Sequence, residues 1–64
     1  DFKDRIRHLC AALKSPYREV ALEHFCEEKT AAEIAKAQNK NTKTVQTQIY
    51  RARSMLKALL ERSD

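Results

Sequence analysis

The side chains best suited to chemistry in this 64-residue chain lie between residues 43 and 54. At about 100° per residue along a helix, one face would carry Lys43, Gln46, Thr47, Tyr50, Arg51 and Ser54. This face holds bases, uncharged hydrogen-bonding groups and a phenol, but no acid. A solvated helix face usually mixes acids and bases, whereas this composition suits phosphates and base edges. The pattern predicts a surface that contacts nucleic acid.

The formal net charge of +4 falls on the C-terminal part of the chain. Residues 1–39 contain seven Lys/Arg and seven Asp/Glu, whereas residues 40–64 contain six Lys/Arg and two Asp/Glu. A polyanion would be drawn to the second segment through long-range attraction and counterion release. A solvated basic helix would carry the same excess, so charge alone does not separate these two interpretations.

Apolar periodicity and capping residues predict an all-α fold of four helices. The first helix is expected over residues 2–13, where Phe2, Ile6, Leu9 and Leu13 form one stripe. Ser15 is expected to cap a second helix that has Pro16 at its first position and ends near Cys26. The missing N–H of a proline costs nothing at that position.

The third helix is predicted from Thr30 and Glu33, which have the spacing of a capping box. It should end near Asn39, because Asn tolerates a left-handed backbone best after Gly. Asn41 or Thr42 would cap the fourth helix, which is expected to run to about residue 61. Its inner stripe comprises Val45, Ile49, Ala52 and Leu56.

The third and fourth helices have the lengths and spacing of a helix-turn-helix. In this motif the second helix enters the major groove of DNA. Ala35 is small enough for the two helices to cross closely, while Ile34, Val45 and Ile49 would fill the space between them. The sequence therefore predicts a single four-helix DNA-binding domain over residues 1–64.

Four stretches of the chain resemble region 4 of the extracytoplasmic-function sigma factors of bacteria. They are Tyr17-Arg18-Glu19-Val20, Glu33-Ile34-Ala35, Thr44-Val45 and Ile49-Tyr50-Arg51-Ala52-Arg53, within a resemblance that covers roughly residues 13–60. The resemblance implies binding to the −35 promoter element of double-stranded DNA and docking on the β-subunit flap of RNA polymerase. It also implies an anti-sigma factor as a further partner.

The resemblance assigns roles to two sets of residues. Those implied to contact bases are Gln46, Thr47, Tyr50 and Arg51. Those implied to lie near DNA phosphates are Lys40, Thr42, Lys43, Thr44 and Arg53. The chain departs from the family pattern at Glu28, where a Gly usually stands, so we expect the turn before the third helix to be built differently. Gln46 and Gln48 replace basic residues, which should weaken the attraction to phosphates.

A zinc site is the first rival interpretation, because His8 and Cys10 repeat the spacing of His24 and Cys26. Residues two apart on a helix point about 200° from each other, so neither pair can close on one metal ion. We therefore expect no cofactor and two reduced cysteines that pack as small apolar residues.

The remaining alternatives concern function class and location. The chain lacks a Gly-rich phosphate loop and a paired-carboxylate cleft, so we do not expect this protein to be an enzyme. A response-regulator output domain remains an alternative. So does a module that docks on polymerase or an anti-sigma factor through Leu56, Leu59 and Leu60, although these leucines could instead close the core against the first helix.

No apolar run approaches the roughly 20 residues that span a membrane. We expect a cytoplasmic fragment of a longer protein with no membrane partner.

Overall fold

The computed structural model describes residues 1–62, and all the regular secondary structure in that range is helical. The elements are α1 (Phe2–Ala11), α2 (Tyr17–Ala21), the π-helical turn η1 (Leu22–Cys26), α3 (Ala31–Gln38) and α4 (Thr42–Arg62). Because η1 continues α2 directly, the predicted all-α arrangement of four helices is confirmed. The last two residues of the expected domain, Ser63 and Asp64, lie outside the described residues.

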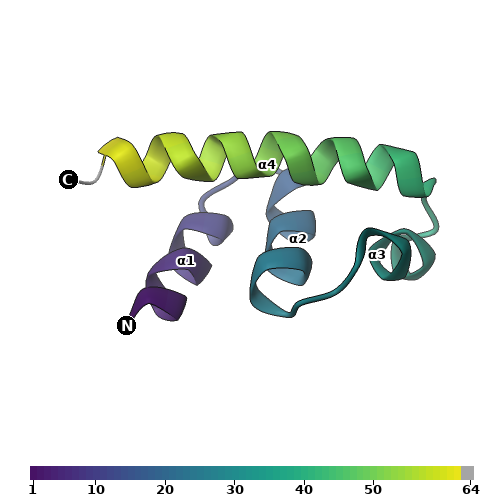
Figure 1. The fold of residues 1–64 in the computed structure, drawn as a ribbon, viewed down its shortest axis with the longest axis horizontal. Coiled ribbons are helices and arrows are strands. Elements are labelled where there is room, and N and C mark those ends of the chain that lie inside the picture. Colours follow the sequence, from purple (N-terminus) through teal and green to yellow (C-terminus); the bar gives the residue numbers. More distant parts are fainter. Residues whose placement is uncertain (63–64) are drawn as a thin grey trace.

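The long helix α4 runs along the whole domain, and the other helices lie along one side of it (Figure 1). Its 21 residues correspond to about 31 Å, against a longest dimension of 36 Å for the domain. The helix α1 lies beside the C-terminal half of α4, α2 near its middle and α3 near its N-terminal end (Figure 1). Among residues 1–62, no helix combines the length and hydropathy that a membrane span requires.

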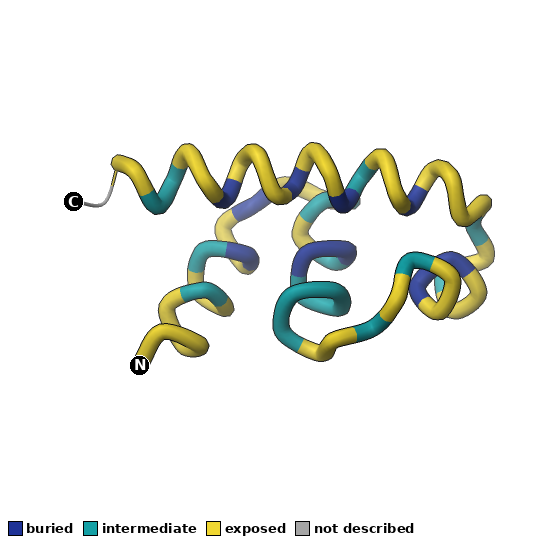
Figure 2. The backbone as a smooth tube through the Cα atoms, in the orientation of Figure 1, coloured by how far each residue is buried: buried dark blue, intermediate teal, exposed yellow. Residues whose placement is uncertain are grey.

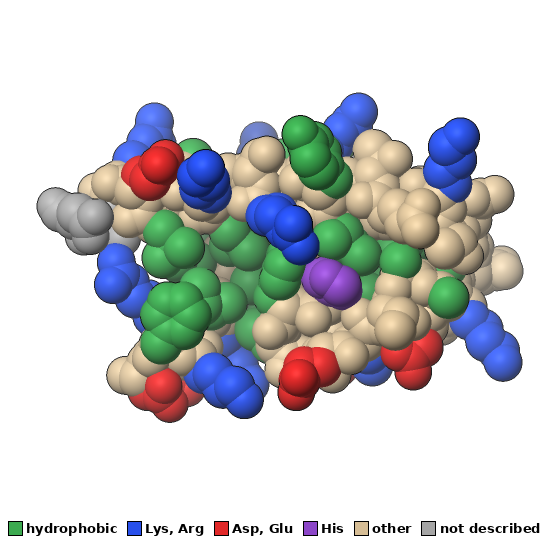
Figure 3. All heavy atoms as spheres, in the orientation of Figure 1, with side chains coloured by type: hydrophobic (Ala, Val, Ile, Leu, Met, Phe, Trp, Pro, Cys, Tyr) green, Lys and Arg blue, Asp and Glu red, His purple; other side chains and the backbone are tan. Residues whose placement is uncertain are grey.

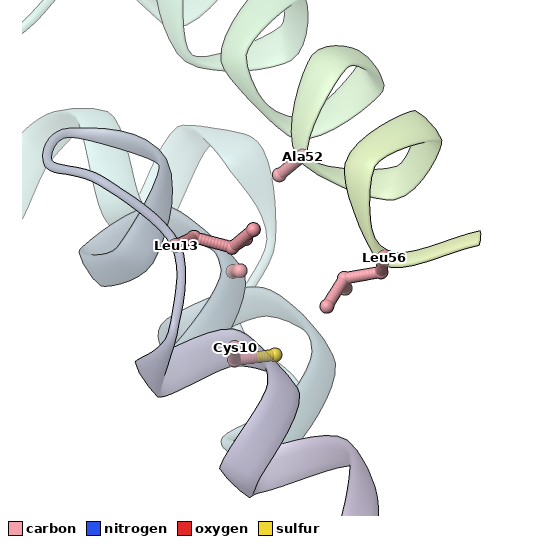
Figure 4. Packing of buried hydrophobic residues seen from close by; sticks show 5 residues of the cluster. Cys10, Leu13, Ala52 and Leu56 are labelled. Carbon is pink, nitrogen blue, oxygen red and sulfur yellow. The ribbon is translucent and has the colours of Figure 1, made fainter. Parts of the chain in front are cut away.

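The core follows the predicted inner stripe of α4. Its four residues, Val45, Ile49, Ala52 and Leu56, are buried. Figure 2 shows the buried positions of α4 on the side of the helix toward the shorter helices. The N-terminal half of the stripe packs with Val20, Ile34 and Ala35. The C-terminal half packs with Cys10, Leu13 and Ala21, and Figure 4 shows Ala52 and Leu56 directed from α4 toward this second cluster.

The leucines near the end of α4 close the core against α1. Leu56 is 6% exposed, and Leu59 packs against the cluster that contains Cys10 and Leu13. Leu56 and Leu59 therefore belong to the core, whereas Leu60 is only partly buried and is not part of this cluster. Phe25 on η1 contacts both clusters and thereby connects the two halves of the core.

Two boundary predictions were wrong. The first helix ends at Ala11, although Leu13 is still buried, and Phe2 is 69% exposed instead of lying in the core. The second helix begins at Tyr17 with Pro16 in the cap position and no side-chain cap. The hydroxyl of Ser15 donates to the Glu19 carboxylate instead of accepting from a backbone N–H. The Ser15-Pro16 peptide bond is cis.

The capping predictions for α3 and α4 are confirmed. Thr30 Oγ1 accepts from the Glu33 N–H at 3.1 Å, and Glu33 Oε1 accepts from the Thr30 N–H at 2.8 Å. The backbone donor, followed by the Thr30 hydroxyl, lowers the pKa of Glu33 below its usual value. Asn39 is left-handed at φ 55°, and Asn41 Oδ1 caps α4 by accepting from the Lys43 N–H at 2.8 Å.

The turn between η1 and α3 differs from our expectation, because Glu28 itself adopts the left-handed conformation, with φ 59°. Three contacts of Lys29 hold this turn in place. Its N–H donates to the Glu23 carbonyl at 3.0 Å, its carbonyl accepts from His24 Nδ1 at 2.8 Å, and its ammonium lies 3.3 Å from the Glu23 carboxylate. These contacts fix a backbone conformation that costs a non-Gly residue about 1–2 kcal/mol.

We expect Glu28→Gly to raise the free energy of unfolding by roughly 0.5–1 kcal/mol, because the gain from relieving the strain exceeds the entropy that Gly adds to the unfolded chain. Glu27→Gly is the matched control, since Glu27 has φ −100°, and it should lower stability. Urea denaturation of the three proteins measures both effects. Equal destabilisation by the two substitutions would contradict the strain at Glu28.

Candidate nucleic-acid interface

The elements α3 and α4 form a helix-turn-helix whose crossing is fully packed. Ile34 and Val45 are 0% exposed, and Ala35 at 3% lets the two helices approach closely. Between the helices, Asn39 reverses the chain, and the Lys40 N–H donates to the Ala35 carbonyl at 2.8 Å. These contacts fix how α4 is rotated about its own axis, and therefore which of its residues face outward.

The four residues predicted to contact bases all lie exposed on the outer face of α4, which is turned away from the other helices. The pairs Gln46 and Tyr50, and Thr47 and Arg51, are four residues apart and are therefore neighbours on the helix surface. The hydroxyl of Thr47 donates to the Lys43 carbonyl at 3.2 Å, which leaves the methyl group of Thr47 for contact with a ligand. The structure thus brings this predicted set together.

Arg51 is linked to α2 by a residue whose polar contact the sequence analysis did not predict. Its Nη1 atom lies 3.5 Å from the hydroxyl of Tyr17, at the outer limit of a hydrogen bond. Tyr17 is half-buried, with its ring against the cluster around Leu13. Nothing in the sequence indicated that the Tyr17 hydroxyl would meet a side chain 34 residues away.

Four of the residues predicted to lie near phosphates gather at the N-terminal end of α4. Thr42, Lys43 and Thr44 are exposed in its first turn, which contains no acid. Lys40 is half-buried just before the helix, and its ammonium donates to Gln48 Oε1 at 3.5 Å. The N-terminus of a helix favours anions through its free N–H groups and its dipole. Lys40 and Lys43 therefore add positive charge where a phosphate is already favoured.

Arg53 lies apart from the other predicted phosphate contacts. It follows Lys43 by ten residues, which corresponds to about 15 Å along the helix axis. Its guanidinium carbon lies 5.9 Å from the centre of the Phe25 ring, within range of a cation–π contact. The position of Arg53 is therefore determined by η1 as well as by α4.

A groove of about 530 Å³ lies between α1, η1 and the C-terminal half of α4. Its apolar lining comes from Phe2, Ile6, Phe25, Cys26, Leu56 and Leu60, and its polar lining from Lys3, Arg7, Arg53 and Lys57. Figure 3 shows hydrophobic side chains gathered between α1 and α4, with Lys and Arg side chains near them. The sequence did not predict the groove, because its pattern put Phe2 on the same apolar stripe as Ile6, Leu9 and Leu13.

The cysteines and histidines offer no metal site within the described residues. Across residues 1–62, no group of three or more His, Cys, Asp or Glu side chains could hold a metal ion. Cys10 is fully buried, as expected, whereas Cys26 is half-buried and lines the groove. Burial, together with the adjacent Cys26 thiol, raises the pKa of Cys10 to about 11.

Comparison with known protein families matches most of the chain to one family. Residues 3–56 match the family model described as Sigma-70, region 4. The match extends from α1 to Leu56, the last residue of the inner stripe of α4, and confirms the resemblance to region 4 of sigma factors. No curated protein and no solved structure matched the chain.

Proposed function

The chain belongs to the sigma-70 region 4 family, the promoter-binding helix-turn-helix domain of sigma factors, and we propose that it binds the −35 element as part of an extracytoplasmic-function sigma factor. The proposal rests on one observation above all. The outer face of α4 is exposed and free of acid from Thr42 to Leu60, while the opposite stripe is buried. Such a helix can enter the major groove without disturbing the core.

Base recognition is assigned to Gln46, Thr47, Tyr50 and Arg51. The amide of Gln46 can pair with N6 and N7 of adenine, and the methyl group of Thr47 can contact the methyl group of thymine. Arg51 lies one turn beyond Thr47, where its guanidinium can donate to O6 and N7 of guanine. Its approach to Tyr17 supports this role, because a tethered guanidinium loses less freedom on binding.

Phosphate contacts are assigned to Lys40, Thr42, Lys43, Thr44 and Arg53. The first four lie at the end of α4 that would enter the groove first, so they can hold the backbone on either side of the contacted bases. Arg53 would have to leave the Phe25 ring, or reach past it, to meet a phosphate. Its assignment is therefore tested separately from that of Lys43.

Replacing Lys43 with Ala should weaken DNA binding by a similar factor on all sequences, and should lower the slope of log affinity against log salt by about one. Arg53→Ala should do the same if Arg53 contacts a phosphate. Lys3→Ala, on α1 and away from the N-terminal end of α4, is the control for Lys43 and should leave the slope unchanged. Fluorescence titrations across a salt series give the slopes. A changed base preference in either variant would contradict its phosphate assignment.

Gln46→Ala should lose about 1–3 kcal/mol of DNA-binding free energy on the preferred site and much less on mismatched sites, because the amide would contact one base pair. The preferred site is obtained by selection from a random DNA pool. Gln48→Ala is the matched control, since Gln48 is half-buried and bonded to Lys40, and should keep the preference. An equal loss of affinity on all sites would mean that Gln46 positions the domain on DNA and does not read a base. Unchanged affinity in a folded variant would mean that the base preference comes from DNA shape.

Docking on RNA polymerase is assigned to the groove between α1 and α4. An apolar groove with cations along its lining suits an amphipathic segment that carries acids beside its apolar face. Membership of a sigma-factor family supports the polymerase flap as its occupant, and favours this function over that of a response-regulator output domain. An anti-sigma factor would act by covering this groove or the outer face of α4.

Phe2→Ala should weaken binding to an isolated β-flap fragment by about tenfold, the effect of losing one aromatic anchor. The fold should survive, because Phe2 is 69% exposed. Met55→Ala is the control, since Met55 is 36% exposed and lies outside the groove. Calorimetric titration measures both affinities, and DNA binding should be unchanged in each. Unaltered flap binding by Phe2→Ala would refute the placement of the flap in this groove.

A further inference from the structure

Cys10 and Cys26 come from different helices and meet beside the groove. Cys10 is near the C-terminal end of α1 and is 0% exposed, while Cys26 is the last residue of η1 and lines the groove. Both are free thiols, and Cys26 packs against the buried cluster that contains Cys10. Burial is the main cause of the raised pKa of Cys10, and the neighbouring Cys26 thiol contributes to it.

We propose that Cys10 and Cys26 form a redox modification site, at which a peroxide converts the two thiols into an intramolecular disulfide that joins α1 to η1. The pair differs from two surface cysteines because one thiol is accessible and the other is enclosed. Cys26 lines the groove and can meet a small oxidant that enters it, whereas the side chain of Cys10 is fully buried. This arrangement separates an attacking thiol from a resolving thiol.

The chemistry proceeds in two steps. The Cys26 thiolate attacks one oxygen of hydrogen peroxide, the O–O bond breaks, and the sulfur becomes a sulfenic acid while the departing hydroxide takes a proton to form water. The sulfur of Cys10 then attacks the sulfenic sulfur, the S–O bond breaks, and the hydroxyl leaves as a second water with the proton of Cys10. Two thiols and one peroxide yield one disulfide and two waters.

The difference in burial between the two thiols favours this order of steps. Burial raises the pKa of Cys10 to about 11, so this thiol stays protonated at neutral pH and is a poor first nucleophile. The sulfenic acid at Cys26 forms next to Cys10, so the second step is an intramolecular reaction and needs no encounter with another molecule. The two cysteines lie on the side of α4 away from its outer face, so this inference does not depend on the proposed promoter contacts.

The test uses the whole reduced chain and stoichiometric hydrogen peroxide. The intact mass should fall by the mass of two hydrogen atoms, and proteolysis without reductant should release one peptide pair joined through Cys10 and Cys26. The melting temperature should rise by several degrees, because the bond restricts the unfolded chain, and it should return to its original value with dithiothreitol. The mass measurement needs no variant, so it is independent of any folding defect.

Two variants test the order of reaction. Cys10→Ser should gain oxygen at Cys26, and Cys26→Ser should stay unmodified at the same dose because its remaining thiol is enclosed. The proposal is overturned if the wild-type chain only gains oxygen at Cys26, or if it forms cross-links between chains instead of within one chain. Modification of Cys26→Ser at the wild-type rate would equally overturn it, since Cys10 would then be the accessible thiol.

Discussion

The rest of the structure depends on the burial of one stripe along α4. Val45, Ile49, Ala52 and Leu56 supply the surface against which every shorter helix packs. None of those helices exceeds ten residues, and helices of that length are marginal in water without tertiary contacts. The same burial fixes the rotation of α4, since turning it by one residue would move the stripe by about 100° and expose it. Stability and the direction in which the outer face of α4 points therefore share one cause.

The sequence predicted the parts of the fold that are determined by local chemistry. The Thr30 and Glu33 cap, the left-handed Asn39 and the inner stripe all depend on residues within one or two helical turns of each other. The turn at Glu28 could not be predicted in this way, because its unfavourable conformation is held by contacts from η1. The π-helical turn also has no local signal, and it carries the Phe25 ring that contacts both halves of the core.

In the candidate site, too, the sequence predicted the positions of some residues and not of others. Residue types and helical periodicity placed Gln46, Thr47 and Tyr50 correctly on one exposed face. Arg53 could not be placed, because it lies at the edge of the buried stripe and its guanidinium is drawn to the ring of Phe25. The groove could not be predicted from the sequence either, because it forms only where α1 and the C-terminal end of α4 meet.

The exposed outer face of α4 also has an evolutionary consequence. Its side chains add little to the core, and substitutions at such surface positions usually change stability by less than about 0.5 kcal/mol. Mutations at Gln46 or Tyr50 can therefore accumulate without threatening folding, even though a domain of this size has little stability to lose. With the proposed base contacts on this face, duplicated copies of such a gene could acquire different target sequences in a few single steps. The helical scaffold would remain the same in each descendant.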